Sequence, residues 1–175
     1  MNRLSLLASL LAVSAFAQSM PALDVTQGNL EIHDAAKTGS GDKVKALLKV
    51  HPDWLDVKNI RGSTPLHLAA INPDASALRA LLEAGAKVNL ADDDGFTPLP
   101  MAAFHRQADY ALLLLEAGAD VNAKTNGGRT PLAMAEKARA DETAGIIALW
   151  ILKGCKPGSD CGLSVTTRDV KKLVK

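Results

Sequence analysis

Two cysteines near the C-terminal end, Cys155 and Cys161, carry the most reactive side chains in this 175-residue sequence. Five residues separate them, including Pro157 and Gly158, which favour a turn that returns one thiol to the other. The spacing predicts a disulfide. A redox-active pair is an alternative, but it lacks the Cys-x-x-Cys spacing of a thioredoxin-like site. A metal site is another, but no histidine or acidic cluster joins the pair at ligand spacing.

The remaining side chains that could do acid-base or metal chemistry do not form a known catalytic pattern. The sequence has no Gly-x-Ser-x-Gly elbow, no phosphate-binding loop and no His-Glu-x-x-His motif. The four histidines, His33, His51, His67 and His105, are scattered along the chain. We therefore expect no catalytic residues, no metal, no cofactor and no enzyme activity.

The run Asp92-Asp93-Asp94-Gly95 is the one local concentration of acidic side chains that invites a calcium interpretation. A calcium-binding EF-hand loop alternates its acidic residues and ends in a distant glutamate, which this run does not do. We expect a solvated turn here, with a contact to a partner protein as the alternative.

The N-terminal residues predict export. Arg3 is followed by an apolar run from Leu4 to Ala17 that ends in Ala15-Phe16-Ala17, the pattern of a secretory signal peptide over residues 1–17 cleaved before Gln18. A retained anchor is the alternative, but the 14-residue run is shorter than the roughly 20 residues that span a bilayer. Export would place the cysteines in an oxidising compartment, where disulfides persist.

Composition restricts the fold class and the partners. Hydrophobic residues make up 47% of the chain but aromatic residues only 3%, which favours closely packed helices over a β-sandwich. The formal net charge is +1, so bulk electrostatics does not favour nucleic acid. Because cleavage would also remove Arg3, we expect a neutral mature protein with no stable membrane insertion.

A repeat of 33 residues organises the rest of the chain. Thr64-Pro65-Leu66 returns as Thr97-Pro98-Leu99 and as Thr130-Pro131-Leu132, and Ala84-Gly85-Ala86 returns as Ala117-Gly118-Ala119. Threonine caps a helix that begins at the following proline, and a glycine ends the second helix of the unit. Each unit is thus predicted to be a helix, a short turn, a second helix and an extended, hairpin-like finger.

Thr64-Pro65-Leu66-His67-Leu68-Ala69-Ala70 resembles the signature of the ankyrin-repeat family almost in full. The resemblance implies an all-α ankyrin-repeat solenoid of about four helix-turn-helix units with short hairpin fingers, and a structural hydrogen-bonding role for His67. We expect a linker over 18–28, units over 29–62, 63–95, 96–128 and 129–153, and a tail over 154–175. The outer units act as caps, and Trp54 and Trp150 cover the ends of the stack. The family often has glycine after the first helix, where this chain has Gly39 but then Pro73, Arg106 and Arg139.

The resemblance also implies a concave binding face made by the fingers and by the ends of the first helices. Mapping by repeat position adds Lys37 and Ser63 to the principal candidates. Those candidates for partner binding are Ile60, Arg61, Ile71, Asn72, Asp93, Asp94, Phe96, Phe104, His105, Asn126, Arg129 and Lys137.

Ile71, Phe96 and Phe104 stand out within this set because they are apolar at positions that are usually on the surface. Aromatic residues flanked by arginine and aspartate are typical of binding hot spots. Our hypothesis is that these residues anchor a partner; the alternative is local packing against neighbouring fingers.

The sequence resembles small exported ankyrin-repeat proteins of Gram-negative bacteria, which implies a monomeric periplasmic scaffold for a protein partner. Because some proteins of that kind are associated with catalase and oxidative-stress defence, the resemblance also implies that this protein supports a catalase. An alternative function is an immunity protein that blocks a toxin or phospholipase delivered to the periplasm. The basic tail after Lys153 is expected to be a solvated end, or else to contact an acidic partner or a lipid headgroup.

Overall fold

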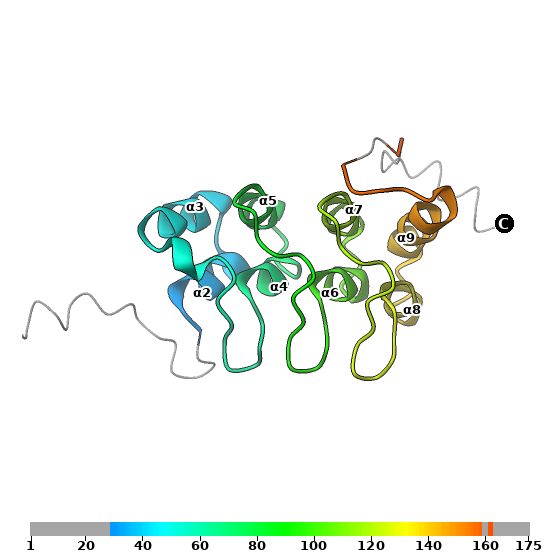
Figure 1. Ribbon diagram of the computed structural model, residues 1–175, viewed down its shortest axis with the longest axis horizontal. Helices are drawn as coiled ribbons and strands as arrows, with labels where there is room; N and C mark the ends of the chain where they lie inside the picture. The colour runs from blue at the N-terminus through cyan, green and yellow to red at the C-terminus, as the bar shows by residue number, and fades with distance from the viewer. Residues whose placement is uncertain (1–28, 159–160, 163–175) are drawn as a thin grey trace, which may run out of the picture.

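The computed structural model describes residues 29–158 and 161–162, which fold into four helix pairs joined by projecting loops (Figure 1). The predicted signal peptide, the linker over 18–28 and residues 163–175 of the tail lie outside the described residues. In chain order the elements are α2 (Glu31–Thr38), α3 (Gly41–Val50), the 3-10 helix η1 (Pro52–Trp54), α4 (Pro65–Ala69), α5 (Ala75–Glu83), α6 (Pro98–Phe104), α7 (Ala108–Glu116), α8 (Pro131–Lys137) and α9 (Asp141–Lys153).

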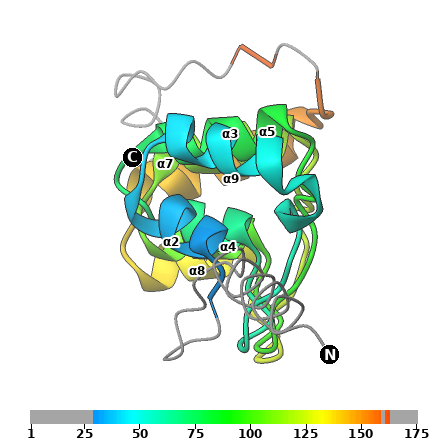
Figure 2. The same ribbon diagram turned by 90° about the vertical axis from the view of Figure 1, so that its left-hand side faces the viewer.

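The helices form two parallel layers. The first helices of the pairs, α2, α4, α6 and α8, make one row, and the second helices, α3, α5, α7 and α9, make the other (Figures 1 and 2). Loops at the edge of the first-helix row project away from the second row. The expected all-α repeat solenoid is confirmed. In the described part of the chain, none of the helices is long and apolar enough to cross a membrane.

Glycine closes the second helix of the two middle units. Gly85 and Gly118 have φ angles of +85° and +96°, in the left-handed region that suits glycine. This geometry lets the Ala86 N–H donate to the Leu81 carbonyl at 3.0 Å, which ends the helix with a satisfied carbonyl group.

Two arginines take the left-handed conformation after the first helices α6 and α8, at positions where the chain has no glycine. Arg106 and Arg139 have φ angles of 63° and 52°, and the left-handed conformation costs roughly 1–2 kcal/mol for a residue with a side chain. The Gln107 N–H still reaches the Ala102 carbonyl at 2.9 Å. The two arginines therefore keep a glycine-like helix ending in the third and fourth units, whereas Pro73 at the same position of the second unit does not have a positive φ angle.

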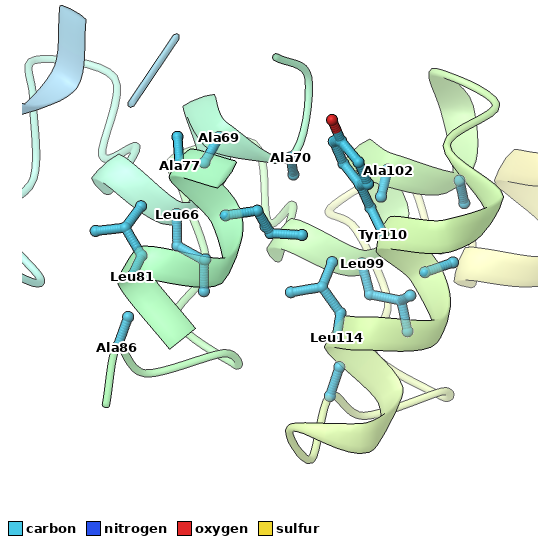
Figure 3. Packing of buried hydrophobic residues seen from close by; sticks show 14 of the residues in the cluster. Leu66, Ala69, Ala70, Ala77, Leu81, Ala86, Leu99, Ala102, Tyr110 and Leu114 are labelled. Carbon is cyan, nitrogen blue, oxygen red and sulfur yellow. The ribbon is translucent and has the colours of Figure 1, made fainter. Parts of the chain in front are cut away.

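Small side chains allow the helices to approach each other closely. Ala69, Ala70, Ala102 and Ala103 have no exposed surface, and leucines from both layers fill the space between them (Figure 3). Truncating a leucine in such a core to alanine generally costs about 2–5 kcal/mol of folding free energy. The fully buried leucines of the two middle units are Leu66, Leu78, Leu81, Leu99, Leu114 and Leu115.

The fingers, defined here as residues 57–64, 90–97 and 123–130, are loops closed by tight turns. The prediction of extended, hairpin-like fingers holds in outline, although these three segments contain no β-strand. A backbone hydrogen bond closes the tip of each finger, and the three bonds recur with the period of the repeat. They run from the Asn59 N–H to the Ser63 carbonyl (3.0 Å), from Asp92 to Phe96 (2.8 Å) and from Thr125 to Arg129 (3.0 Å).

Backbone bonds also join each finger to the next. The Asp93 N–H donates to the Arg61 carbonyl at 3.1 Å, and the Asn126 N–H donates to the Asp94 carbonyl at 2.9 Å. The close approach favours glycine, since Gly62 has a φ angle of +71° and an added Cβ would lie 2.9 Å from the backbone nitrogen of Asp93. Arg61 and Asp94, at the tips of the first two fingers, thus contribute their backbone carbonyls to these bonds, and their side chains are not needed for them.

The first unit is one residue longer than the 33-residue period, because His33 and His67, which stand at the same repeat position, are 34 residues apart. The extra length is taken up by η1, where the His51 ring stacks on Trp54 with centroids 3.9 Å apart. Trp54 and Trp150 are both buried, in the first and last units respectively. Both side chains belong to the packed core, and their role in covering the ends of the stack stays a prediction.

Cys155 and Cys161 form the predicted disulfide. The loop that it closes folds back over the stack, because the Gly158 N–H donates to the Glu116 carbonyl at the end of α7 (3.2 Å). The ammonium group of Lys153 donates to the Cys161 carbonyl at 3.1 Å. The end of α9 is thereby tied to the third unit as well as to its own.

One buried hydroxyl breaks the repeat of hydrogen bonds. Among the residues that the structure describes, the buried Thr97 Oγ1 has no hydrogen-bond partner. The equivalent Thr64 Oγ1 lies 2.8 Å from the Nδ1 atom of His67. A buried hydroxyl without a partner costs about 1–3 kcal/mol.

Pro100 explains the difference. In the last unit Thr130 Oγ1 accepts a hydrogen bond from the Ala133 N–H at 3.3 Å. Pro100 occupies the position equivalent to both His67 and Ala133, so the third unit has neither an imidazole nor a backbone N–H to offer.

Replacing Thr97 with valine should therefore stabilise the protein. We expect Thr97→Val to raise the free energy of unfolding by about 1 kcal/mol, because it removes a buried polar group without changing the side-chain shape. Thr64→Val, the matched control, should lower it by a similar amount. Urea denaturation measures both. In a Pro100→Ala background, which supplies an N–H, Thr97→Val should lose its benefit. A loss of stability in the wild-type background would contradict this account.

Candidate partner-binding groove

A groove lies between the first two fingers and the C-terminal ends of α2, α4 and α6. Its volume is about 350 Å³. We call this feature the concave groove. It is lined by Lys37, Asn59, Arg61, Ser63, Leu68, Ile71, Asp92, Asp94, Phe96, Met101, Phe104 and His105.

The floor of the concave groove is apolar. Leu68, Ile71, Phe96 and Met101 are half-buried, and Phe104 is 41% exposed. The Phe104 ring also meets the His105 ring edge-on, with centroids 5.6 Å apart. A partly exposed aromatic ring at the end of a helix leaves apolar surface that a bound side chain would cover.

Charged groups of both signs surround this floor. Lys37, Arg61 and Asp94 line the groove and are exposed, and we call these three charged residues its rim. Asp92 has a different role: its Oδ1 accepts hydrogen bonds from the backbone N–H groups of Asp94 (3.1 Å) and Phe96 (2.8 Å). Because that oxygen is used in the turn, we expect Asp94, Lys37 and Arg61 to be the charges available to a partner.

Half of the predicted binding residues meet in this groove. Of the twelve, Arg61, Ile71, Asp94, Phe96, Phe104 and His105 line it. Five others are exposed but lie outside it: Ile60, Asp93, Asn126, Arg129 and Lys137. The side chain of Asn126 is partly committed to the stack, because its Nδ2 donates to the Asp93 carbonyl at 2.9 Å.

The prediction for Asn72 is wrong. Only 2% of its surface is exposed, and its Nδ2 donates to the carbonyls of Ala36 (2.9 Å) and Gly39 (3.1 Å) in the preceding unit. Its own carbonyl accepts the Tyr110 hydroxyl at 2.7 Å. Asn72 therefore links three units and is not available to a partner.

Ser63 was also expected to be offered to a partner, but it is 6% exposed. It contributes to the groove wall rather than to the accessible surface. Conversely, the mapping by repeat position did not point to Asn59, Leu68 or Met101, which also line the groove together with Asp92. Asn59 and Asp92 share a repeat position at the start of the finger tip, and that shared position was the available signal.

His67 fixes the finger that carries Phe96. Its Nε2 lies 2.9 Å from the Phe96 carbonyl, which can only accept, so Nε2 carries the proton. Its Nδ1 accepts the Thr64 N–H at 3.0 Å and must therefore be unprotonated. The geometry requires a neutral ring, and burial lowers the pKa of His67, although the Phe96 carbonyl opposes that shift. The expected structural role of His67 is confirmed.

His33 does the same in the first unit. Its Nδ1 accepts the Leu30 N–H at 3.0 Å, and its Nε2 donates to the Val57 carbonyl at 3.1 Å. Burial is again the largest cause that lowers the pKa of His33, against the raising effect of the Val57 carbonyl. Two neutral histidines thus hold successive fingers to the helices.

The described residues contain no group of three or more His, Cys, Asp or Glu side chains placed to hold a metal ion. In the acidic run, Asp92 organises the finger tip, and Asp93 and Asp94 are exposed at it. What the arrangement offers chemically is an apolar surface with a charged rim, suited to binding.

A family model described as ankyrin repeats, in three copies, matches residues 32–125, which is more than half of the chain. The chain belongs to the ankyrin-repeat family. Ankyrin repeats act generally as modules for protein–protein interaction, and this is the coarse function that the family membership supports.

Short segments of the chain resemble parts of proteins from varied sources. It is 46% identical over 57 residues to the nuclear factor NF-kappa-B p105 subunit of Gallus gallus, covering 30% of this chain and 6% of that protein. It is 36% identical over 66 residues to a putative ankyrin repeat protein, FPV240, of Fowlpox virus (strain NVSL), covering 38% and 16%. It is 30% identical over 74 residues to the E3 ubiquitin-protein ligase KEG of Arabidopsis thaliana, covering 42% and 4%. The chain thus spans less than a fifth of each of these relatives.

The two buried histidines predict that acid destabilises the fold. Their pKa values are lower in the folded chain than in the unfolded chain, so the unfolded state binds more protons below about pH 6.5. The contribution of the two histidines to the free energy of unfolding should be complete above that pH. Below it, the free energy of unfolding should fall by up to about 1.4 kcal/mol per pH unit for each histidine. Urea denaturation between pH 7.5 and 5.5 measures the slope. His67→Gln, which keeps a donor and an acceptor, should reduce it; an unchanged slope would contradict the assignment.

Proposed function

We propose that this protein is an exported interaction scaffold that binds a partner protein in the periplasm through the concave groove. The observation that carries the proposal is Phe104, an aromatic side chain that is 41% exposed in a groove whose other apolar residues are half-buried. Rings of this kind, in a pocket with a charged rim, are typical of binding hot spots.

The chemistry of the groove indicates what the partner presents. An apolar side chain would fill the hollow over Ile71 and Phe104, and polar or charged groups beside it would meet Arg61 on one finger and Asp94 on the next. The rim contributes mainly to orientation and association rate, since exposed charge pairs add little affinity. The partner segment is therefore expected to be short, with an apolar anchor between charges.

Export is supported by the sequence of residues 1–17 and agrees with the disulfide between Cys155 and Cys161, because disulfides persist in oxidising compartments. Within the periplasm, we favour a scaffold that supports its partner, with the link to catalase as the working hypothesis. An immunity protein that blocks an incoming toxin or phospholipase is the second candidate, since the same groove serves either role.

Processing can be tested directly. When the full chain is expressed in a Gram-negative host, the protein recovered from the periplasm should begin at Gln18, as measured by intact mass. A cytoplasmic protein that retains residues 1–17 would refute export while leaving the groove proposal standing.

The groove is tested by comparing two exposed apolar residues. The immobilised mature chain is used to capture partners from periplasmic extract, and the affinity for the partner so identified is then measured by calorimetry. Phe104→Ala should weaken binding about tenfold or more, the usual effect of losing a hot spot, with little change in melting temperature. Val50→Ala is the control, since Val50 is 70% exposed but lies on α3, away from the groove. Equal effects of the two changes would refute the groove as the site.

Phe96→Ala should behave differently from Phe104→Ala. Phe96 packs partly against the core, so its truncation should lower both the affinity and the melting temperature. The activity of the captured partner then separates the two candidate functions. A supporting scaffold leaves its partner active, whereas an immunity protein abolishes its activity.

A further inference from the structure

In the part of the chain that the structure describes, no helix pair packs on the outer surface of α8 and α9 (Figure 1). We call it the terminal face. It has a hollow of about 320 Å³ whose lining includes Leu132, Leu149 and Leu152. Leu132 occupies the repeat position of Leu66 and Leu99, which have no exposed surface inside the stack. Leu152 is 78% exposed.

Exposed apolar surface is unusual at the end of a solenoid. Terminal repeats generally carry a polar outer face, because otherwise the stack offers water the surface that each inner unit buries. Leucine at three positions of the terminal face departs from that rule. The departure indicates that another segment covers the face.

The charges on the terminal face indicate what kind of segment this is. Glu136 and Asp141 line the hollow, and the described residues that line it include no basic side chain. Glu136 stands at the repeat position of Ala70 and Ala103, both fully buried. A second copy of the chain, placed face to face, would bring these carboxylates against one another. A basic, apolar segment fits the face better.

We propose that the C-terminal segment of the same chain, residues 163–175, covers the terminal face. It contains Arg168, Lys171, Lys172 and Lys175 against one acidic residue, Asp169. Val170, Leu173 and Val174 follow the i, i+3, i+4 spacing at which one side of a helix carries apolar residues. The segment therefore matches the face in both charge and apolar character.

The disulfide loop brings the end of the described chain close to the terminal face. The Lys153 ammonium group contacts the Cys161 carbonyl at 3.1 Å, so the chain leaves the described region within one lysine side chain of the end of α9. Leu152, at the edge of the terminal face, directly precedes Lys153 in α9. The 13 residues that follow Gly162 reach at most about 45 Å when fully extended. Reaching the leucines of α8 and α9 is thus within the length of the segment.

Hydrogen–deuterium exchange on the full mature chain tests this proposal. Lys171→Glu/Lys172→Glu should speed exchange of the α9 amides by about tenfold, because uncovering a face lowers the free energy of local opening. Glu136→Lys alone should have a similar effect, and combining it with the tail change should restore slow exchange. Lys124→Glu, a charge reversal in the third finger, is the control and should have no effect on α9.

Leu173→Asp provides a second test that does not depend on charge pairing, and it too should speed exchange in α9. Unchanged exchange in both tail variants, with the wild-type chain monomeric in sedimentation, would show that the face is open and would overturn the proposal. Protection of α9 that rises with protein concentration would overturn it in favour of a second copy. Slow exchange of the α4 and α5 amides in every variant verifies that the fold is intact.

Discussion

The close approach of one helix pair to the next is the constraint on which this structure depends. Alanine at positions such as Ala70 and Ala103 lets neighbouring helix pairs pack closely, and only at that separation can the backbone of one finger bond to the backbone of the next. Asp93 and Asn126 make those bonds through their N–H groups. The packing of the helices therefore determines the alignment of the fingers, and the alignment of the fingers creates the groove.

The same arrangement separates stability from recognition, although not completely. Arg61 and Asp94 contribute backbone carbonyls to the stack while their side chains remain at the rim. Phe96 contributes both to stability and to recognition. Its carbonyl accepts a hydrogen bond from His67, and its side chain packs partly against the core. The same residue also lines the groove. Changes in recognition can therefore be made at low cost around Phe96 but not at it.

Much of the fold could be predicted because its information is local and repeated. The 33-residue period identified the helix pairs, and proline and glycine marked their ends. The site was predicted less well, since a repeat position specifies where a backbone lies but not where a side chain points. Asn72 was misplaced for that reason: its amide turns inward to carbonyls of the preceding unit. The unpartnered Thr97 hydroxyl depends on which atoms Pro100 lacks, and that becomes visible only when the units are compared in three dimensions.

The loop closed by Cys155 and Cys161 makes the two ends of the solenoid unequal. In a repeat stack each unit touches mainly its neighbours, so unravelling ordinarily proceeds inward from either end. Here Gly158 bonds to Glu116, and Pro157 lies beside Gly118, so the chain after α9 is fastened to the unit before it. Unfolding of the last helix pair therefore also requires that these contacts of Pro157 and Gly158 with the third unit be broken. Unfolding of the repeat units should consequently begin at the N-terminal end of the stack and proceed toward the C-terminal end.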